Sequence, residues 1–298
     1  MKRLLKWIGR VLGVLLLIIV AAVGVVYAVS GSRINKSYDV AVETIPIPDD
    51  AAAIAHGEHI AQTRGCTDCH GADMAGGILL NDPMLATIYV SNLTSGQGGS
   101  GADYSNEDYL RALRHGVGQD GKALWIMPSH ESYYLSDEDT GALIAYLKTV
   151  SPIDREHGEN RAGPLARVML LAGVLPLLPV ELIDHAAPRP AAPAVGLTAE
   201  YGTYLGVSCA GCHGAELAGG PVPGAPPGII APNLTVSGEL QNWTEEEFTQ
   251  LLRTGITPTG REMGSWMPIG STKHFTDEEI SAIWLYLQDM PPVEISEQ

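Results

Sequence analysis

The sequence predicts a mostly α-helical protein in which two similar small domains follow an N-terminal transmembrane helix. Three observations support this prediction: a long uncharged stretch near the N-terminus, an internal duplication in the rest of the chain, and apolar residues at helical spacing in each half. The 298 residues, 45% apolar and 17% charged, are typical of a folded chain of about two domains. We expect an anchor at 1–36, a stalk at 37–50, domain 1 at 51–152, a linker at 153–195 and domain 2 at 196–293.

The N-terminal segment indicates the compartment. Residues 11–29 form a run of 19 residues without a charge, close to the ~20 that a transmembrane helix needs. The ten residues before this run include four basic residues and no acid, so they should stay in the cytoplasm while the chain after Ser30 lies outside. A cleaved signal peptide is the alternative, although this apolar run exceeds the usual ~7–15 residues.

The charge is divided unevenly along the chain. The formal net charge is −16, but residues 1–36 hold six basic residues and no acid, which leaves 12 basic and 34 acidic residues, a net charge of −22, for the remainder. An acidic body of this kind argues against a nucleic-acid partner, because phosphate binding needs positive charge. The excess of acidic residues is typical of a soluble protein surface. The alternative interpretation is that it favours docking of a basic partner.

All four cysteines fall in two copies of the pattern C-x-x-C-H, which is the attachment signature of c-type haem. Two thiols three positions apart can each add to a haem vinyl group, and the following histidine then becomes the proximal iron ligand. A redox C-x-x-C pair or a four-cysteine zinc site is the alternative, but neither requires a histidine in both copies. The sequence therefore predicts two covalently attached haem c groups. The residues are Cys66, Cys69 and His70 in the first copy and Cys209, Cys212 and His213 in the second.

The two halves align at an offset of 140–143 residues along most of their length. Two copies are too few for a solenoid and predict two related domains, each able to hold one haem. Both halves are expected to contain a helix before the cysteines, a middle helix that ends at a glycine, and a last helix that begins at a Ser or Thr cap. The expected spans of the first and middle helices are 51–63 and 106–114 in one half and 198–205 and 245–253 in the other.

Methionine is the expected sixth ligand of the iron, because it raises the reduction potential relative to a second histidine. Met127 and Met267 lie 57 and 54 residues beyond their motif histidines, each before a proline, and they correspond between the halves. The ordinary role of a methionine is core packing. His130 is an alternative to Met127, and Met263 or His274 is an alternative to Met267, but none of these three is repeated.

Two further repeated pairs are candidates for the haem sites. Arg114 and Arg253 end the middle helices, where a guanidinium either pairs with a haem propionate or only suits the helix dipole. Asn92 and Asn233 either fix the loop over the haem edge or form a turn.

Together these residues resemble class I cytochromes c. They are more specifically similar to the cytochrome subunits that accompany membrane-bound periplasmic dehydrogenases, in the order Asn-Leu-Thr, then an aromatic with Ser or Thr and Glu, then an Arg two residues before a Gly. Those subunits usually have three such domains, whereas this chain has two and an N-terminal anchor. The resemblance implies two tandem class I cytochrome c domains, covalent haem, one-electron transfer, and a bacterial inner-membrane protein whose haem domains lie in the periplasm.

The linker is apolar enough over residues 165–183 to raise the question of a second span. Arg167, Pro176 and Glu181 count against one. A single extra span would also place the second attachment motif in the cytoplasm. We therefore expect a helix-and-turn linker that packs on the domains or lies on the membrane surface.

The sequence thus predicts a membrane-anchored dihaem cytochrome c that carries single electrons between a dehydrogenase or quinol-oxidising complex and a downstream acceptor. The expected partners are the membrane, a periplasmic dehydrogenase, and a basic soluble carrier or terminal oxidase. No catalytic residue is expected. The alternatives are a dihaem peroxidase-like enzyme, in which one iron accepts substrate, and an electron-accepting anchor subunit of a dehydrogenase.

Overall fold

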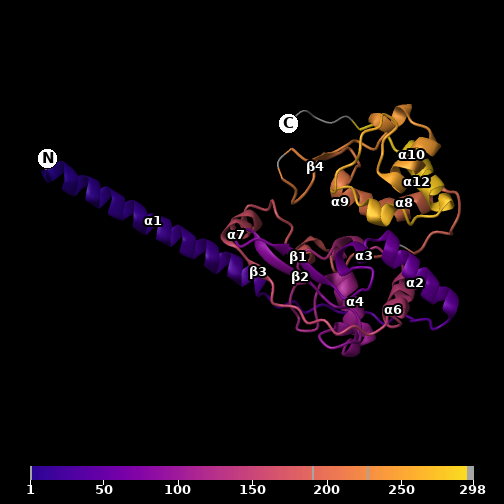
Figure 1. Ribbon diagram of the computed structural model, residues 1–298, viewed down its shortest axis with the longest axis horizontal. Coiled ribbons are helices and arrows are strands. Elements are labelled where there is room, and N and C mark those ends of the chain that lie inside the picture. The colour runs from indigo at the N-terminus through magenta and orange to yellow at the C-terminus, as the bar shows by residue number, and fades with distance from the viewer. Residues whose placement is uncertain (1, 190, 227, 294–298) are drawn as a thin grey trace.

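A single long helix extends away from the rest of the molecule in the computed structural model, which describes residues 2–189, 191–226 and 228–293 (Figure 1). This helix, α1 (Lys2–Ile34), contains the uncharged run, and its apolar side chains are exposed. Among the described residues it is the one helix long and apolar enough to cross a membrane, a test that an N-terminal signal sequence also passes. It is therefore a candidate membrane anchor.

Domain 1 is helical around its attachment motif, with a small sheet beside it. Its helices are α2 (Ala51–Thr63), α3 (Cys66–His70), α4 (Asn106–His115), α5 (Ser129–Ser132) and α6 (Asp137–Leu147), with a 3-10 turn η1 (Ser100–Ala102). Strands β1 (Gly77–Asn81), β2 (Ala86–Val90) and β3 (Arg161–Ala162) form an antiparallel sheet in that order. Gly77 lies opposite Val90, and Thr87 lies opposite Arg161. Strands β1 and β2 lie between the predicted first and middle helices, and β3 lies in the predicted linker; no strand was expected in either region.

Domain 2 repeats this plan with a shorter sheet. Its helices are α8 (Ala199–Gly206), α9 (Ala210–His213), α10 (Glu245–Thr254), α11 (Ile269–Thr272) and α12 (Asp277–Asp289), with 3-10 turns η3 (Val207–Cys209) and η4 (Glu239–Asn242). Strands β4 (Gly220–Pro221) and β5 (Ile230–Ala231) pair antiparallel. The mostly α-helical class is confirmed, and the first, middle and last helices lie where the apolar spacing predicted them, within a residue or two.

The first and last helices of each domain cross at a glycine. A Cβ on Gly57 of α2 would lie 2.0 Å from the Ala142 carbonyl oxygen of α6, and a Cβ on Gly202 of α8 would lie 1.9 Å from the Ala282 carbonyl oxygen of α12. Because no real Cβ approaches a backbone oxygen so closely, only glycine permits this crossing. The two positions correspond between the halves, so the duplication extends to the way in which the helices pack.

Local caps fix where the helices begin. Ser105 with Asp108, Thr244 with Glu247, and Thr276 with Glu279 form complete capping boxes. The predicted start of α6 is only half formed: Ser136 accepts a hydrogen bond from the Asp139 amide, but the Asp139 carboxylate instead binds His56 and Tyr204. The Asp139 carboxylate, which would complete this capping box, makes tertiary contacts in its place.

The predicted linker, 153–195, contains one short helix and one 3-10 turn, α7 (Pro164–Leu171) and η2 (Pro179–Leu182), as expected, and also the short strand β3, which was not expected. It packs on domain 1 and against the end of α1. Leu170, Leu177 and Val180 are buried in one apolar cluster with Ile88 and Val117. The linker therefore covers one face of domain 1 and leaves the matching face of domain 2 uncovered.

Candidate functional site

Both attachment motifs lie on short helical turns that follow the first helix of their domain. The first motif is α3, and the second runs from η3 into α9. In each, the motif histidine is held by its Nδ1 atom: His70 Nδ1 lies 2.8 Å from the Ser91 carbonyl oxygen, and His213 Nδ1 lies 2.8 Å from the Pro232 carbonyl oxygen. The hydrogen bond at Nδ1 sets the tautomer of each imidazole and leaves its Nε2 atom free to bind a metal.

Burial shifts the pKa values of both motif histidines and of Cys66 and Cys209. It lowers the pKa of His70 and of His213, so both imidazoles are neutral, which is the form that binds iron. Burial also raises the pKa of the Cys66 thiol to about 12 and that of Cys209 to about 11. A redox C-x-x-C pair has the opposite property, a lowered thiol pKa.

The four cysteines are free thiols and do not form one metal site. No group of three or more His, Cys, Asp or Glu residues suited to a metal ion occurs within residues 2–189, 191–226 and 228–293. The geometry therefore does not match a four-cysteine zinc site, in which all the thiolates surround one ion. Each pair of cysteines instead stands beside its own histidine.

Domain 2 contains an apolar cavity beside its motif. Its lining includes Cys209 and His213 of the motif and Met263 and Met267 of the methionine loop. The rest of the wall is mostly apolar and aromatic. It includes Leu234, Leu240, Trp243, Phe248, Leu252, Phe275 and Leu287. A large apolar cofactor with one covalent edge and one axial nitrogen fits this wall, because its faces would be shielded from water.

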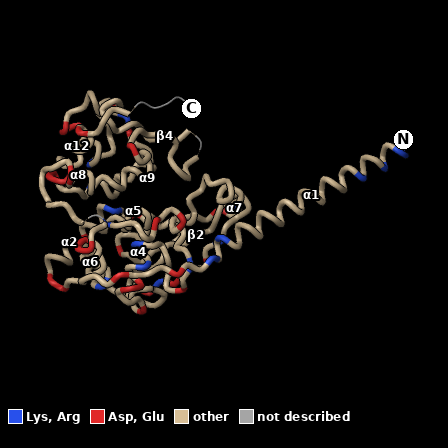
Figure 2. Tube along the Cα trace, turned by 180° about the vertical axis from the view of Figure 1, so that it is seen from behind, with Lys and Arg blue, Asp and Glu red and all other residues tan. Residues whose placement is uncertain are grey.

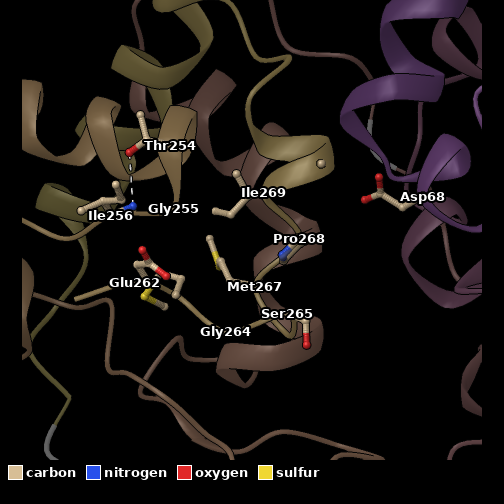
Figure 3. Close-up of a pocket in the computed structure, with 12 residues that line it drawn as sticks. Asp68, Thr254, Gly255, Ile256, Glu262, Gly264, Ser265, Met267, Pro268 and Ile269 are labelled. Atoms are coloured by element: carbon tan, nitrogen blue, oxygen red, sulfur yellow. Dashed lines mark hydrogen bonds between the residues drawn. The ribbon is translucent and has the colours of Figure 1, made fainter. Parts of the chain in front are cut away.

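The methionine loops lie as the duplication predicts. Met127 and Met267 are both half-buried and pack on the apolar core, as do Cys66 and Cys209. Met267 also borders an open pocket of about 620 Å³ with Met263 and Ile269 (Figure 3). His274 does not line either pocket that Met267 lines, whereas Met263 lines both. The ligand roles of Met127 and Met267 remain predictions, and Met263 remains the rival of Met267.

The two arginines make the same contact in both domains. Arg114 Nη2 donates to Asp137 at 2.6 Å, and Arg253 Nη2 donates to Asp277 at 2.7 Å, so each joins the middle helix to the first residue of the last helix. The Arg114 side chain is 2% exposed and Arg253 is 30% exposed. Among the described residues, the buried Nε atom of Arg114 has no hydrogen-bond partner, so the ion pair does not occupy this guanidinium fully. The pairing of either arginine with a haem propionate remains an untested prediction.

The repeated asparagines act as cross-links. The Asn92 side-chain oxygen accepts hydrogen bonds from the Thr94 amide and hydroxyl, and its Nδ2 donates to the Ile153 carbonyl at 2.8 Å. Asn233 repeats this arrangement with Thr235 and the Val293 carbonyl. Both asparagines thus form a turn and tie it to the segment that follows the last helix.

The two motifs meet at an interface between the domains that the sequence did not reveal. Arg64, two residues before Cys66, donates from Nη1 to the Leu205 carbonyl at 2.9 Å and from Nη2 to the Tyr204 carbonyl at 3.1 Å. His59 of domain 1 lies 2.9 Å from the Glu279 carboxylate of domain 2. Apolar side chains of both domains form one continuous core cluster.

The middle of each motif contacts the short helix that follows the other domain's methionine. Asp68, between Cys66 and Cys69, accepts a hydrogen bond from Ser271 of α11, and Figure 3 shows Asp68 facing the Met267 loop from domain 1. In the reverse direction, Glu131 of α5 fills the space beside Gly211, where a Cβ would lie 2.3 Å from Glu131 Oε1. No local pattern marked Asp68, Glu131 or Ser271, although the equivalence of positions 131 and 271 was a usable signal.

Comparison with known proteins gives a match for each domain. Residues 54–151 match the family model described as cytochrome c, and residues 199–287 match the one described as cytochrome C oxidase, cbb3-type, subunit III. The chain is 31% identical over 273 residues to the gluconate 2-dehydrogenase cytochrome c subunit of Pantoea cypripedii, covering 80% of this chain and 60% of that protein.

Two other relatives have similar names and similar coverage. The alcohol dehydrogenase (quinone) cytochrome c subunit of Gluconobacter oxydans is 28% identical over 281 residues, which is 82% of this chain and 56% of that protein. The fructose dehydrogenase cytochrome subunit of Gluconobacter japonicus is 28% identical over 280 residues, which is 83% of this chain and 55% of that protein. The chain therefore spans a little over half the length of these relatives.

Proposed function

Because the chain contains two cytochrome c domains and is homologous to cytochrome c subunits of dehydrogenases, we propose that it is a membrane-anchored dihaem electron-transfer protein of the periplasm. It would accept electrons from a dehydrogenase and pass them to a downstream acceptor. The observation that carries the proposal is the paired geometry of the motifs: two neutral histidines with free Nε2 atoms, each beside two free thiols, on domains that share one core.

Haem c, when bound, supplies a one-electron redox centre at each motif. The chain's own residues have three tasks around it. Cys66, Cys69, Cys209 and Cys212 would hold the groups covalently, and His70 and His213 would present nitrogen to the iron. Met127 and Met267 would present sulfur. The apolar wall of domain 2 excludes water, which is one of the means by which a protein sets a reduction potential.

The domain interface suits transfer between the two sites. The Arg64 and Asp68 contacts tie the first motif to domain 2 within two residues of its cysteines, and Glu131 of domain 1 lies beside Gly211 of the second motif. Fixed contacts of this kind keep the two sites in one arrangement, so little rearrangement would be needed between successive electrons. The same residues explain why this protein would need both domains, rather than two separate carriers.

The proposed electron donor is a periplasmic dehydrogenase. This part rests on the relatives, whose names describe cytochrome subunits of gluconate, alcohol and fructose dehydrogenases. The acidic body makes a basic soluble carrier, or a terminal oxidase, a suitable acceptor, and such docking should weaken as salt is raised.

Purification of the full chain in detergent tests the proposal. We expect two covalently bound haem groups per chain by pyridine haemochrome assay and protein mass, and two reversible one-electron steps in an anaerobic redox titration. A chain with fewer than two covalent groups, or one that is not reversibly reduced, would contradict it. Co-purification of a dehydrogenase at low salt, and its loss at high salt, would identify the donor.

One observation favours a second function. The Met267 loop is largely exposed, with Trp266 44% exposed, and it borders the open pocket. An exposed loop of this kind would allow the iron of domain 2 to bind an external ligand, as a peroxidase-like enzyme requires. Carbon monoxide binding by the reduced full chain, together with peroxide turnover, would favour this alternative over simple electron transfer.

A further inference from the structure

The linker helix is fastened to the end of α1. Arg167 Nη1 donates to Ser30 Oγ at 2.9 Å, and its guanidinium lies 4.6 Å from the centre of the Tyr27 ring. Arg33 of α1 donates to the Leu170 carbonyl at 3.0 Å and pairs with Glu181. Figure 1 shows α7 beside the end of α1 from which the body begins. The contacts fall at residues 27–33, where the uncharged run ends, so α7 stands at the level of the expected membrane surface.

The outward face of this segment is apolar throughout. Within residues 164–176 each exposed residue is apolar or glycine, and Leu165, Val168 and Val174 are 45%, 50% and 56% exposed. Leu165, Val168 and the capping residue Ala172 lie at helical spacing on one side of α7, whereas Ala166 and Leu170 on the other side are buried, Leu170 in the apolar cluster with domain 1. Leu182, at the end of η2, is 58% exposed and extends the same kind of surface.

The charged groups nearby suit a lipid headgroup region. The nearby charged side chains bind between α1 and the linker. Arg33 of α1 binds Glu181 and the Leu170 carbonyl of the linker, and Arg167 of the linker binds Ser30 of α1. Lys36 and Arg161 are exposed at the junction, with the exposed Glu159 carboxylate 4.0 Å from Arg161, and Figure 2 shows basic residues where α1 meets the body. Basic side chains beside an apolar face are common in elements that lie in the membrane interface.

We propose that residues 164–176, with Leu182, form a membrane-contact surface that inserts into the headgroup and acyl boundary of the bilayer that α1 crosses. The inference rests on the membrane anchoring included in the proposed function. The occupant is lipid because the surface is continuous with the anchor and is tied to it by Arg33 and Arg167. Two attachments, one spanning and one interfacial, would fix domain 1 against the membrane and hold the domain interface in one orientation.

Photocrosslinking in lipid nanodiscs tests the surface with the full, haem-loaded chain. The photoreactive residue p-benzoylphenylalanine would replace Val168 or Val174 in the test variants, Val20 of α1 in the positive control, and Leu285 of α12, which is 42% exposed, in the matched control. After illumination, peptide masses report lipid adducts. We expect adducts at Val20, Val168 and Val174 in yields several-fold above that at Leu285.

The outcomes separate the two proposals. Adducts at Val20 with none at Val168 and Val174 would overturn the membrane-contact surface and leave the anchor standing. An absence of adducts at Val20 as well would overturn the anchor and the surface together. In native membranes, a protein adduct in place of lipid at Val168 would also overturn the proposal, because it would assign the surface to a protein partner. Equal haem content in all four variants verifies that each is folded.

Discussion

The two methionine loops share their sequence pattern and their backbone contacts but differ in what covers them. The Leu124 amide donates a hydrogen bond to the Gly116 carbonyl at 2.7 Å, and the Met263 amide donates one to the Gly255 carbonyl at 2.7 Å. The two loops therefore begin in the same way. In domain 1 the linker then covers the loop: the Ile126 amide donates to the Leu177 carbonyl at 3.0 Å, and Val117 is 0% exposed. The equivalent residue of domain 2, Ile256, is 37% exposed. Two copies of one domain have thus acquired a covered methionine loop and an open one.

Removal of the thiols should produce the largest effect and tests whether the copies are equivalent in attachment. Cys66→Ala with Cys69→Ala, and separately Cys209→Ala with Cys212→Ala, should each remove half of the covalent haem, measured as pyridine haemochrome per chain. Either double variant that keeps two covalent groups would contradict the assignment of the motifs.

Removal of the methionines should show the difference between the copies. Met127→Ala and Met267→Ala should each abolish about half of the sulfur-to-iron absorption at the red end of the oxidised spectrum, because each site has one sulfur ligand. Carbon monoxide should then bind the reduced Met267→Ala protein faster, since its loop lacks a cover. Equal rates would mean that the linker does not control access, and an unchanged band in Met267→Ala would favour Met263.

Loss of linker packing should destabilise one domain only. Leu177 is fully buried, so Leu177→Ala should lower the free energy of unfolding of domain 1 by about 2–5 kcal/mol. Leu182→Ala, at an exposed position of the same segment, is the matched control and should change it by about 0.5 kcal/mol or less. Denaturant unfolding of the full chain in detergent measures both, and equal small effects would show that the cover is not part of the core.

The smallest effect concerns the interface between the copies. Burial raises the pKa of Glu131, beside the second motif, to about 7. The folded state therefore binds a proton that the unfolded state has released between about pH 4.5 and 7, and stability should fall as the pH rises through this window. Glu131→Gln should remove that slope, which is of the order of 1–3 kcal/mol over the window.

Denaturant unfolding at several pH values between 4.5 and 8 measures this difference. Glu246→Gln, on the exposed start of α10, provides a control that should keep the wild-type slope. Parallel pH profiles for wild type and Glu131→Gln would contradict a protonated carboxyl at the interface.

Much of the fold could be predicted because its signals are local. Apolar spacing and caps such as Thr276 with Glu279 placed the helices within a residue or two. The sheet of β1, β2 and β3 could not be predicted in this way, since β3 pairs with residues more than seventy positions earlier. Gly57 and Gly202 were also missed, because the need for glycine arises only where another helix crosses.

The candidate site also has features that local sequence patterns predicted and features that depend on tertiary contacts. The C-x-x-C-H motifs, the uncharged run at 11–29 and the repeated methionines are short patterns that the sequence displays by itself, and the haem attachment, membrane anchoring and iron ligation that they indicate stay predictions. Only the tertiary structure decided which loop the linker covers, and that Asp139 leaves its cap for His56 and Tyr204. The physical reason is that burial and side-chain pairing depend on segments far apart along the chain, and nothing in either segment alone specifies its neighbour.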